Sequence, residues 1–342
     1  MKKLLISAAI AAISASSSFA AQAAGPLVAT ATNGANNQVL VYDTTGKLVA
    51  TLPTQGEGGA AGNAGGLTYG FEHLAVVNFG SSNVTVFEHD ADHSNFIVSQ
   101  IVPAASNPLS VALSADHLYI LGTKTIESHR IDTHGIDPRA DGIASLVLAD
   151  GSAAQVGVLT RELVIAEKNN VIETVKLDAS GAVTGATSAV ANIPANVNAP
   201  FGLATRGNDA YVTIAHANEI SLVRNDAVLA TTPSNTQHAP CWATLDGPFL
   251  FTANAASGTV SRYAVYGQKI VQDAAVAATV AATPLDIAYR AGTLGLVDHS
   301  ATGSDLSIYS VDEDGNLTRT ALVNFTVATT NGVAVIPAAA AN

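Results

Sequence analysis

Short apolar segments, separated by Gly, Pro, Asn and Asp, recur along the chain after residue 24. Some are continuous, such as residues 74–77 and 163–166, and others alternate with polar residues, such as residues 83–87. Continuous runs of this length are typical of buried strands, and alternation is typical of strands with one exposed face. No amphipathic pattern of helical period and length appears in this part of the chain. The pattern therefore predicts an all-β protein.

The strands are grouped into units that recur at a nearly constant spacing. One position marks each unit, and the seven markers are Ala64, Pro108, Ala153, Pro200, Pro240, Pro284 and Thr330. Their spacings of 44, 45, 47, 40, 44 and 46 residues match the length of a four-stranded propeller blade. Proline can open a strand without breaking its ladder of hydrogen bonds. We therefore expect each marker to begin the innermost strand of a blade.

The two ends of the chain complete one unit between them. One apolar strand, residues 333–336, follows the last marker, and three strands precede the first, at residues 27–32, 38–43 and 47–52. Pairing them would close the ring and remove exposed strand edges. The sequence thus predicts a seven-bladed β-propeller with four antiparallel strands per blade, forming a single domain over residues 24–342.

The first residues have the composition of a secretory signal. Lys2 and Lys3 precede an apolar run at residues 4–13, and small residues follow at 20–23. The run is shorter than the roughly 20 residues that a membrane helix needs, and no later segment is long enough. We expect cleavage after residue 23 and a secreted or periplasmic protein without a membrane span.

Charge and cysteine content narrow the possible partners. Removing residues 1–23 leaves 13 Lys and Arg against 27 Asp and Glu, a net charge of 13 − 27 = −14. Nucleic acid is therefore not an expected partner, because binding to phosphates depends on basic patches. The single cysteine, Cys241, cannot form an internal disulfide, and we expect it to be a buried small apolar residue. We expect a monomer with a small molecule as its ligand.

Several short motifs recur in register with the blades. They lie at residues 77–84 (VNFGSSNV), 166–172 (AEKNNVI), 199–202 (APFG), 240–242 (PCW), 252–258 (TANAASG), 284–286 (PLD) and 314–317 (DGNL). In these motifs the chain resembles the lactonase-like seven-bladed propellers, the superfamily of bacterial 6-phosphogluconolactonase and the fungal carboxymuconate lactonising enzymes, and in particular an exported branch of it.

The resemblance implies the propeller fold over essentially the whole mature chain. For the enzymes of the superfamily it also implies a blade start rich in histidine and arginines that hold acidic groups. The third marker segment here, residues 152–155, contains no histidine, and the arginines form no visible cluster. The resemblance therefore speaks for the fold more than for an activity.

Polar residues occupy an aligned position at the end of the second strand in most blades. We expect these residues to surround the mouth of the central channel; they are Asn78, Glu167, His216, Asn254 and Asp298. Such a ring of oxygen ligands could hold a divalent cation such as calcium, which could polarise a lactone carbonyl. The alternative is a purely structural role, because Asn and Asp stabilise turns.

Residues close to the markers are further candidates. His238 lies two residues before Pro240 and could act as a general base, although a loop histidine bonded to the backbone is the alternative. Gln155, Trp242 and Asp286 each lie two residues after a marker, where they could contact a ligand. Trp242 would then be a stacking wall, or else a packing residue between blades.

Two classes of function remain open on the sequence. One is a lactone hydrolase or cyclase in which Glu167 or His238 activates water while Asn78 and Asn254 position the substrate. The other is a non-catalytic propeller that binds a small molecule, a lipid or a protein at the channel or its rim.

Overall fold

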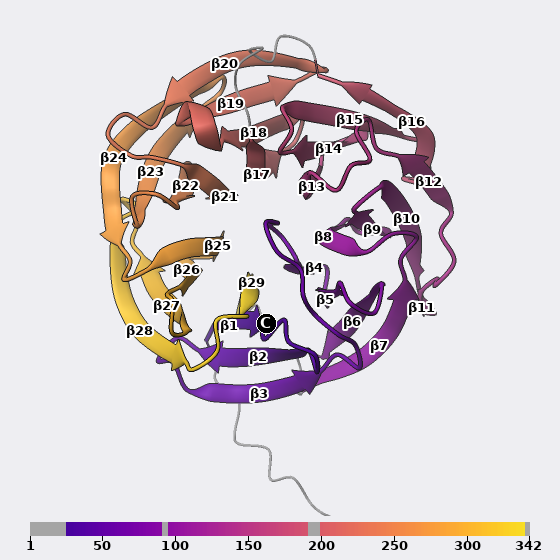
Figure 1. The fold of residues 1–342 in the computed structure, drawn as a ribbon, viewed down its shortest axis with the longest axis horizontal. Coiled ribbons are helices and arrows are strands. Elements are labelled where there is room, and N and C mark those ends of the chain that lie inside the picture. The colour runs from indigo at the N-terminus through magenta and orange to yellow at the C-terminus, as the bar shows by residue number, and fades with distance from the viewer. Residues whose placement is uncertain (1–24, 91–94, 191–198, 339–342) are drawn as a thin grey trace, which may run out of the picture.

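The seven predicted units form a ring of seven antiparallel sheets around a central channel (Figure 1). The computed structural model describes residues 25–90, 95–190 and 199–338, so the predicted signal at residues 1–23 lies outside the described residues. The sequence prediction of a seven-bladed β-propeller is confirmed. Among the described residues, no helix is long and apolar enough to cross a bilayer.

The strands are numbered along the chain, and each blade is given from its innermost to its outermost strand. Blade 1 contains β29 (Asn331–Ile336), β1 (Leu27–Ala31), β2 (Gln38–Asp43) and β3 (Leu48–Pro53). Blade 2 contains β4 (Leu67–Gly70), β5 (His73–Asn78), β6 (Asn83–Asp90) and β7 (Asn95–Pro103), and blade 3 contains β8 (Pro108–Leu113), β9 (His117–Gly122), β10 (Thr125–Asp132) and β12 (Gly142–Ser145). Blade 4 contains β13 (Ala153–Val158), β14 (Glu162–Glu167), β15 (Val171–Leu177) and β16 (Val183–Ala189).

The remaining three blades have the same order. Blade 5 contains β17 (Pro200–Arg206), β18 (Asp209–Ile214), β19 (Glu219–Arg224) and β20 (Ala227–Pro233), and a short 3₁₀ helix, η1 (Ala215–Ala217), follows β18. Blade 6 contains β21 (Pro240–Asp246), β22 (Phe249–Asn254), β23 (Thr259–Tyr266) and β24 (Lys269–Thr279). Blade 7 contains β25 (Thr283–Arg290), β26 (Thr293–His299), β27 (Ser304–Val311) and β28 (Leu317–Phe325).

Blade 3 departs from the predicted four-stranded pattern. Its outer edge is divided between β12 and a two-residue strand, β11 (Gly135–Ile136), and both pair with β10. The intervening segment contains Pro138, which lacks an N–H group and so cannot donate to a ladder. The edge is therefore interrupted in this blade.

Blade 1 joins the two ends of the chain, as the sequence predicts. β29 pairs antiparallel with β1, and the register places Leu27 opposite Ile336 and Ala29 opposite Ala334. The C-terminal strand thus becomes the innermost strand of the blade that the N-terminal strands build. This closure protects the edge of β1, which would otherwise be free to pair with another chain.

The core consists of apolar layers between neighbouring blades. The second strand of each blade is almost entirely buried, and its side chains contact the next blade. Phe251 of β22 and Leu294 of β26, for example, belong to one buried cluster that spans blades 6 and 7. Burial of such side chains contributes about 1.5–3 kcal/mol each to folding.

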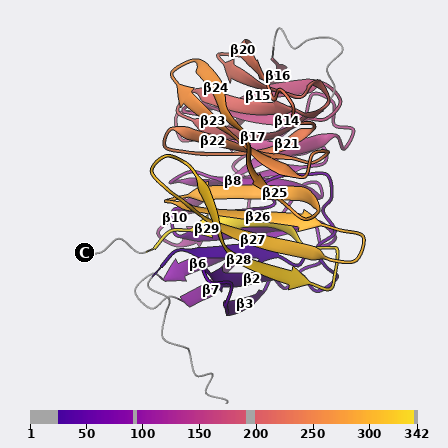
Figure 2. The ribbon, with the colours of Figure 1, turned by 90° about the vertical axis from the view of Figure 1, so that its left-hand side faces the viewer.

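The two faces of the ring differ in what covers them. Figure 2 shows the blades from the side, stacked around the ring with their strands running between the two faces. We call the face at which the innermost strands begin the loop face, and the face at which they end the opposite face. In Figure 1 the segment between β3 and β4 passes across the channel on the loop face.

Candidate functional site

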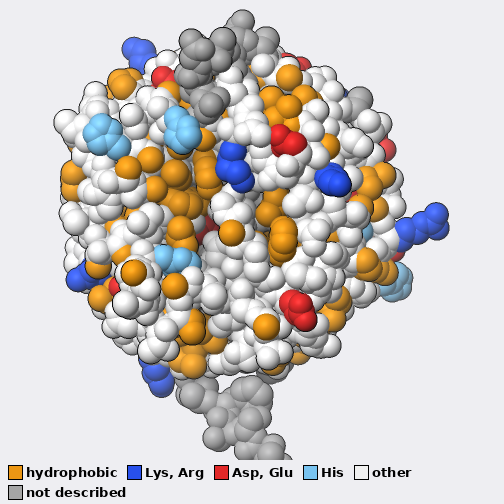
Figure 3. Space-filling view, viewed as in Figure 1, with side chains coloured by type: hydrophobic (Ala, Val, Ile, Leu, Met, Phe, Trp, Pro, Cys, Tyr) orange, Lys and Arg blue, Asp and Glu red, His pale blue; other side chains and the backbone are white. Residues whose placement is uncertain are grey.

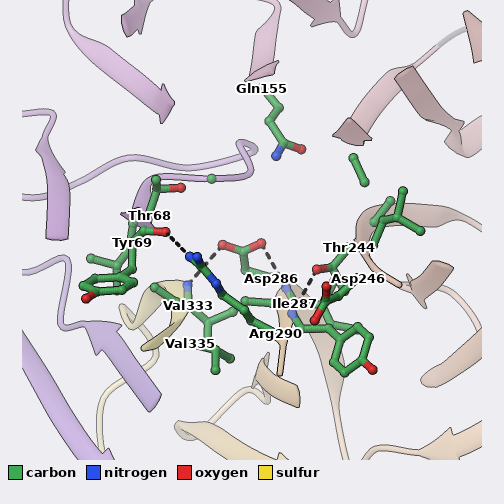
Figure 4. Close-up of a pocket in the computed structure, with 18 of the residues that line it drawn as sticks. Thr68, Tyr69, Gln155, Thr244, Asp246, Asp286, Ile287, Arg290, Val333 and Val335 are labelled. Carbon is green, nitrogen blue, oxygen red and sulfur yellow. Dashed lines mark hydrogen bonds between the residues drawn. The ribbon is translucent and has the colours of Figure 1, made fainter. Parts of the chain in front are cut away.

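The central channel contains a pocket of about 430 Å³. Its lining comes from the innermost strands of several blades and extends from Gln155 and Asp286, near the start of those strands, to Asp246 and Arg290 at their ends (Figure 4). The pocket therefore reaches the opposite face. Its walls combine hydroxyl, amide and charged groups with aliphatic side chains of the strands.

Gln155 and Asp286, each two places after a marker, reach into the channel where the innermost strands are irregular. The register of β13 shifts between Ala153 and Gln155, and that of β25 shifts between Pro284 and Asp286. Such bulges leave backbone N–H groups without a partner in the ladder. Side chains of the preceding blade supply acceptors instead, so that the ring is held by hydrogen bonds between blades.

In three blades, a side chain of the innermost strand accepts a hydrogen bond from a backbone N–H of the next blade. The Gln155 side-chain oxygen accepts from Leu203 N at 2.6 Å, and the Ser110 hydroxyl accepts from Val156 N at 3.3 Å. The Asp286 carboxylate accepts from Val333 N at 3.2 Å and from Ile287 N at 2.9 Å. Asp286 is 4% exposed, and burial raises its pKa to about 7 although the backbone donors oppose the rise.

Arg290 lies at the open end of the channel pocket. It ends β25 of blade 7, and its Nη1 donates to Tyr69 O of β4 at 3.2 Å, while the guanidinium lies 5.8 Å from the centre of the Tyr69 ring. The side chain therefore extends from blade 7 to blade 2. Nearby, the Asp246 carboxylate accepts from Ala291 N at 2.7 Å, which fixes a second charged group at this end.

The other end of the channel is covered by residues 56–66, which we call the plug loop. Asn63 anchors it: its Nδ2 donates to Leu109 O at 2.6 Å, and its Oδ1 accepts from Asn331 Nδ2 at 2.9 Å. The Asn63 carbonyl accepts from Trp242 Nε1 at 3.1 Å. Lys168 Nζ also donates to Gly62 O at 2.6 Å. The loop, which connects blade 1 to blade 2, is thus held by residues of blades 1, 3, 4 and 6.

A second pocket lies beside the plug loop on the loop face, and we call it the Trp242 pocket. It has a volume of about 450 Å³. Figure 3 shows hydrophobic side chains gathered around a hollow beside the centre of this face. Its lining residues are Asn33, Gly59, Ala60, Ala61, Gly62, Asn63, Phe201, Trp242, Leu285, His299, Ala328, Thr329 and Asn331.

Two aromatic rings form the rigid wall of the Trp242 pocket. Phe201 and Trp242 meet edge to face, with centroids 5.2 Å apart, and the bond from Trp242 Nε1 to the plug loop fixes the indole. His299 supplies a polar group: its Nε2 lies 2.5 Å from Thr330 O, and burial lowers its pKa. Because a carbonyl only accepts, Nε2 carries the proton and Nδ1 of the neutral ring is an acceptor.

The sequence candidates at the ends of the second strands lie elsewhere. Asn78 and Asn254 are buried inside their blades, where their amides donate to hydroxyl groups on the third strand, Thr85 at 2.9 Å and Ser261 at 2.8 Å. Asp298 is also buried. None of these three lines the channel pocket or the Trp242 pocket. The hydrogen bonds of the two asparagines are those of residues that hold a blade together.

Glu167 is buried in blade 4 next to a second carboxyl group, Glu173, which the sequence interpretation missed. Glu167 accepts from Leu148 N at 3.2 Å, and Glu173 accepts from Val147 N at 2.8 Å. Burial, with the charge of Glu167 as a smaller cause, raises the pKa of Glu173 to about 8, so Glu173 is protonated at neutral pH. Glu167 is 0% exposed and lines neither pocket. Activation of water there would require the segment between β12 and β13, whose Leu148 N bonds to Glu167, to move away.

The two histidine candidates are exposed and lie in separate loops. His216 belongs to η1, and His238 precedes β21, where its backbone N donates to Ser257 Oγ at 2.8 Å. Glu167 lies in blade 4 and His238 in the loop leading to blade 6, with blade 5 between them. In the described part of the chain, no group of three or more His, Cys, Asp or Glu side chains could hold a metal ion.

Of the predicted site residues, the structure brings Gln155 and Asp286 together in the channel pocket and puts Trp242 at the loop face. The sequence interpretation missed Phe201, Asn63 and Arg290. Phe201 follows a marker proline directly, which is a usable signal. Asn63 lies 179 residues from its partner Trp242, so sequence spacing gives no indication of their contact.

The architecture defines a class, the seven-bladed β-propellers. No protein-family model and no curated protein matches the sequence. Among solved structures, the chain is similar to a putative 6-phosphogluconolactonase from Bacteroides fragilis, with a TM-score of 0.62 and 12% identity over 93% of this chain and 99% of that one.

Two further solved structures are similar to this chain. A putative 6-phosphogluconolactonase from Bacteroides uniformis has a TM-score of 0.62 and 14% identity, covering 92% of this chain and 100% of that one. A catalytically inactive virginiamycin B lyase from Staphylococcus aureus with quinupristin has a TM-score of 0.57 and 15% identity, covering 80% and 91%. At these identities the likeness describes the fold.

Proposed function

We propose that this protein is an exported, non-catalytic propeller that binds a small molecule in the Trp242 pocket. The observation that carries the proposal is the fixed aromatic wall of Phe201 and Trp242 in an apolar pocket of about 450 Å³. Ligand pockets of this kind are mostly apolar and contain few polar groups that set orientation. The proposed ligand has a flat apolar ring and a hydrogen-bond donor for Nδ1 of His299.

Catalysis at the predicted residues has less support. Glu167 is buried without access to either pocket, and His238 lies in the loop before blade 6. The names of the similar structures, putative 6-phosphogluconolactonases and a virginiamycin B lyase, nevertheless make lactones worth testing as ligands and as substrates. The same titration can separate binding from turnover.

Export rests on the signal-like residues 1–23 and on the acidic, disulfide-free composition of the rest of the chain. Expression of the full chain in a bacterial host, followed by fractionation and mass measurement, tests it. We expect a periplasmic product that begins at residue 24. Recovery of the uncleaved chain from the cytoplasm would contradict export.

Binding can be followed with the protein's own fluorescence, because Trp242 is its only tryptophan. We expect 6-hydroxy-3,4-dihydrocoumarin, which is a lactone, and 2-naphthol, which is not, to change this emission saturably, because each has an aromatic ring and a hydroxyl donor; unchanged ligand should be recovered afterwards. Phe201→Ala should weaken binding about tenfold, because it removes one aromatic wall. Tyr266→Ala, which truncates a 64% exposed side chain at the β23–β24 turn, is the matched control.

Three results would count against the proposal. Emission that no member of the panel changes would remove the pocket as a ligand site. Equal affinity of Phe201→Ala and Tyr266→Ala would mean that the signal arises elsewhere. Lactone opening that is lost in Glu167→Gln, measured by acid release, would replace the binding function with the hydrolase.

A further inference from the structure

The Asp286 carboxyl group has no cationic partner among the described residues. It is 4% exposed, and its hydrogen bonds come from backbone N–H groups. The ion pairs found in the described chain involve other residues. Buried charges in proteins are normally paired, because an isolated charge in a medium of low polarity is very costly. An unpaired carboxylate facing a cavity is therefore unusual.

The structural task of Asp286 does not require a charge. At the corresponding place in blade 4, Gln155 accepts from the N–H of the next blade through a neutral amide oxygen at 2.6 Å. In blade 3, the hydroxyl of Ser110 accepts in the same way at 3.3 Å. A neutral acceptor is thus sufficient to hold neighbouring blades together, and the negative charge of Asp286 is additional to that role.

The surroundings of Asp286 suit a small cation with an organic part. The carboxyl group lies in the space between the innermost strands (Figure 4). The pocket around it has a volume of about 430 Å³, and its lining extends to Asp246 and Arg290 at the opposite face. The walls around it include aliphatic side chains such as Leu203 and Val333, together with the hydroxyl of Thr244. The other charged groups of the pocket, Arg290 and Asp246, lie at its open end and are opposite in sign, and the Arg290 guanidinium is held against Tyr69. The net negative charge of the protein favours the approach of cations.

We propose that the channel pocket binds a primary organic ammonium ion, with Asp286 as its counter-ion. This site is separate from the Trp242 pocket, because the plug loop lies between the loop face and the channel. The ammonium group forms an ion pair with the carboxylate, and the hydrocarbon part lies against the strands. Failure of one site would leave the other unaffected.

Binding of such an ion is linked to protonation. Because burial raises the pKa of Asp286 to about 7, part of the protein carries a protonated Asp286 near neutral pH. An ammonium ion favours the ionised carboxylate, so its binding releases a proton. Affinity should therefore increase as pH rises from 6 to 8, and the measured enthalpy should depend on the ionisation heat of the buffer.

Isothermal titration calorimetry of the mature protein tests the proposal with propylammonium and phenethylammonium, and with 1-propanol as a neutral comparison. We expect saturable binding of the amines, no binding of the alcohol, and release of up to about one proton at pH 6. Asp286→Asn keeps an acceptor oxygen for Val333 N, just as the amide oxygen of Gln155 serves Leu203 N. This variant should weaken amine binding about tenfold or more. Glu313→Gln, which removes an exposed charge in the β27–β28 turn, should bind like the wild type.

Several results would overturn the inference. Absence of amine binding to the wild type between pH 6 and 8 would mean that Asp286 is simply a protonated structural residue. Weak binding without proton release, equal in Asp286→Asn and Glu313→Gln, would indicate general surface attraction. Calcium binding that releases a proton and excludes the amines would assign the carboxylate to an inorganic cation. If Asp286→Asn does not fold, proton release by the wild type alone decides between these results.

Discussion

Asp298 occupies in blade 7 the place that Asn78 and Asn254 occupy in blades 2 and 6. The asparagine amides donate to hydroxyl groups of the third strand, whereas neither Asp298 oxygen has a hydrogen-bond partner among the described residues. Burial, followed by the charge of Asp305, raises the pKa of Asp298 to about 6. The carboxylate is therefore a costly substitute for an amide at this position.

Asp298→Asn should stabilise the protein by about 1 kcal/mol at pH 8. The register of β26 and β27 pairs Asp298 with Asp305 and places Ser307 two residues further along, so a new amide would have acceptors available. Because the folded-state pKa lies above the unfolded value of about 3.9, the wild type loses stability as pH rises from about 4 through 6.

Urea unfolding of Asp298→Asn and wild type at pH 4.5 and pH 8 measures this effect. The gain should be present at pH 8 and largely absent at pH 4.5, where the wild-type carboxyl group is protonated in the folded state. A variant that is less stable than the wild type at pH 8 would show that the ionised carboxylate has partners outside the described contacts.

The candidate site shows what the sequence can indicate about single residues. The alignment of the repeats selected the position two residues after three of the markers, and bulges there direct Gln155 and Asp286 into the channel. It also selected the ends of the second strands, but those side chains bond inside their blades. The distinction depends on the direction of a side chain in a twisted sheet, which the repeat period does not encode.

Among the strands, β29 has the most demanding position, because it closes the ring and packs beside β4. Gly332 has a φ of +84°, and a Cβ atom built there would lie 2.9 Å from Leu67 Cβ and 3.1 Å from Leu67 N. A side chain at this position would therefore be strained in its backbone and too close to the neighbouring strand.

Gly332→Ala should destabilise the protein by about 2 kcal/mol or more. The matched control is Gly34→Ala, because a Cβ atom there has no neighbour within 4 Å and its φ is not positive. Denaturant midpoints of both variants provide the comparison. Equal stability of the two would show that β29 can shift away from β4 without cost.

The strands themselves were largely predictable, and the errors have a physical origin. The innermost strands begin at Pro108, Ala153, Pro200 and Pro240 as the markers indicate, since proline is tolerated at the first residue of a strand. β4 begins three residues after its marker Ala64, because the glycine-rich plug loop continues to Gly66 and contains no proline. The role of that loop in covering the channel depends on contacts with distant blades.

On the scale of the whole molecule, the predicted cation ring would require side chains from several blades to meet. The side chains of these residues are instead buried in separate blades: Asn78 in blade 2, Glu167 in blade 4, Asn254 in blade 6 and Asp298 in blade 7. We therefore expect neither EDTA nor added calcium to change the melting temperature of the mature protein. Calorimetric scans with and without chelator measure this, and a calcium-dependent rise in melting temperature would contradict it.

The pairing of Leu27 with Ile336 has a consequence for how this protein can be attached to something else. Both described ends of the propeller leave the ring on the opposite face, side by side, while the Trp242 pocket lies on the loop face. A tether at either end would orient the molecule with this pocket outward and the channel entrance toward the support. Immobilisation through the C-terminus should therefore hinder amines entering the channel more than ligands of the Trp242 pocket.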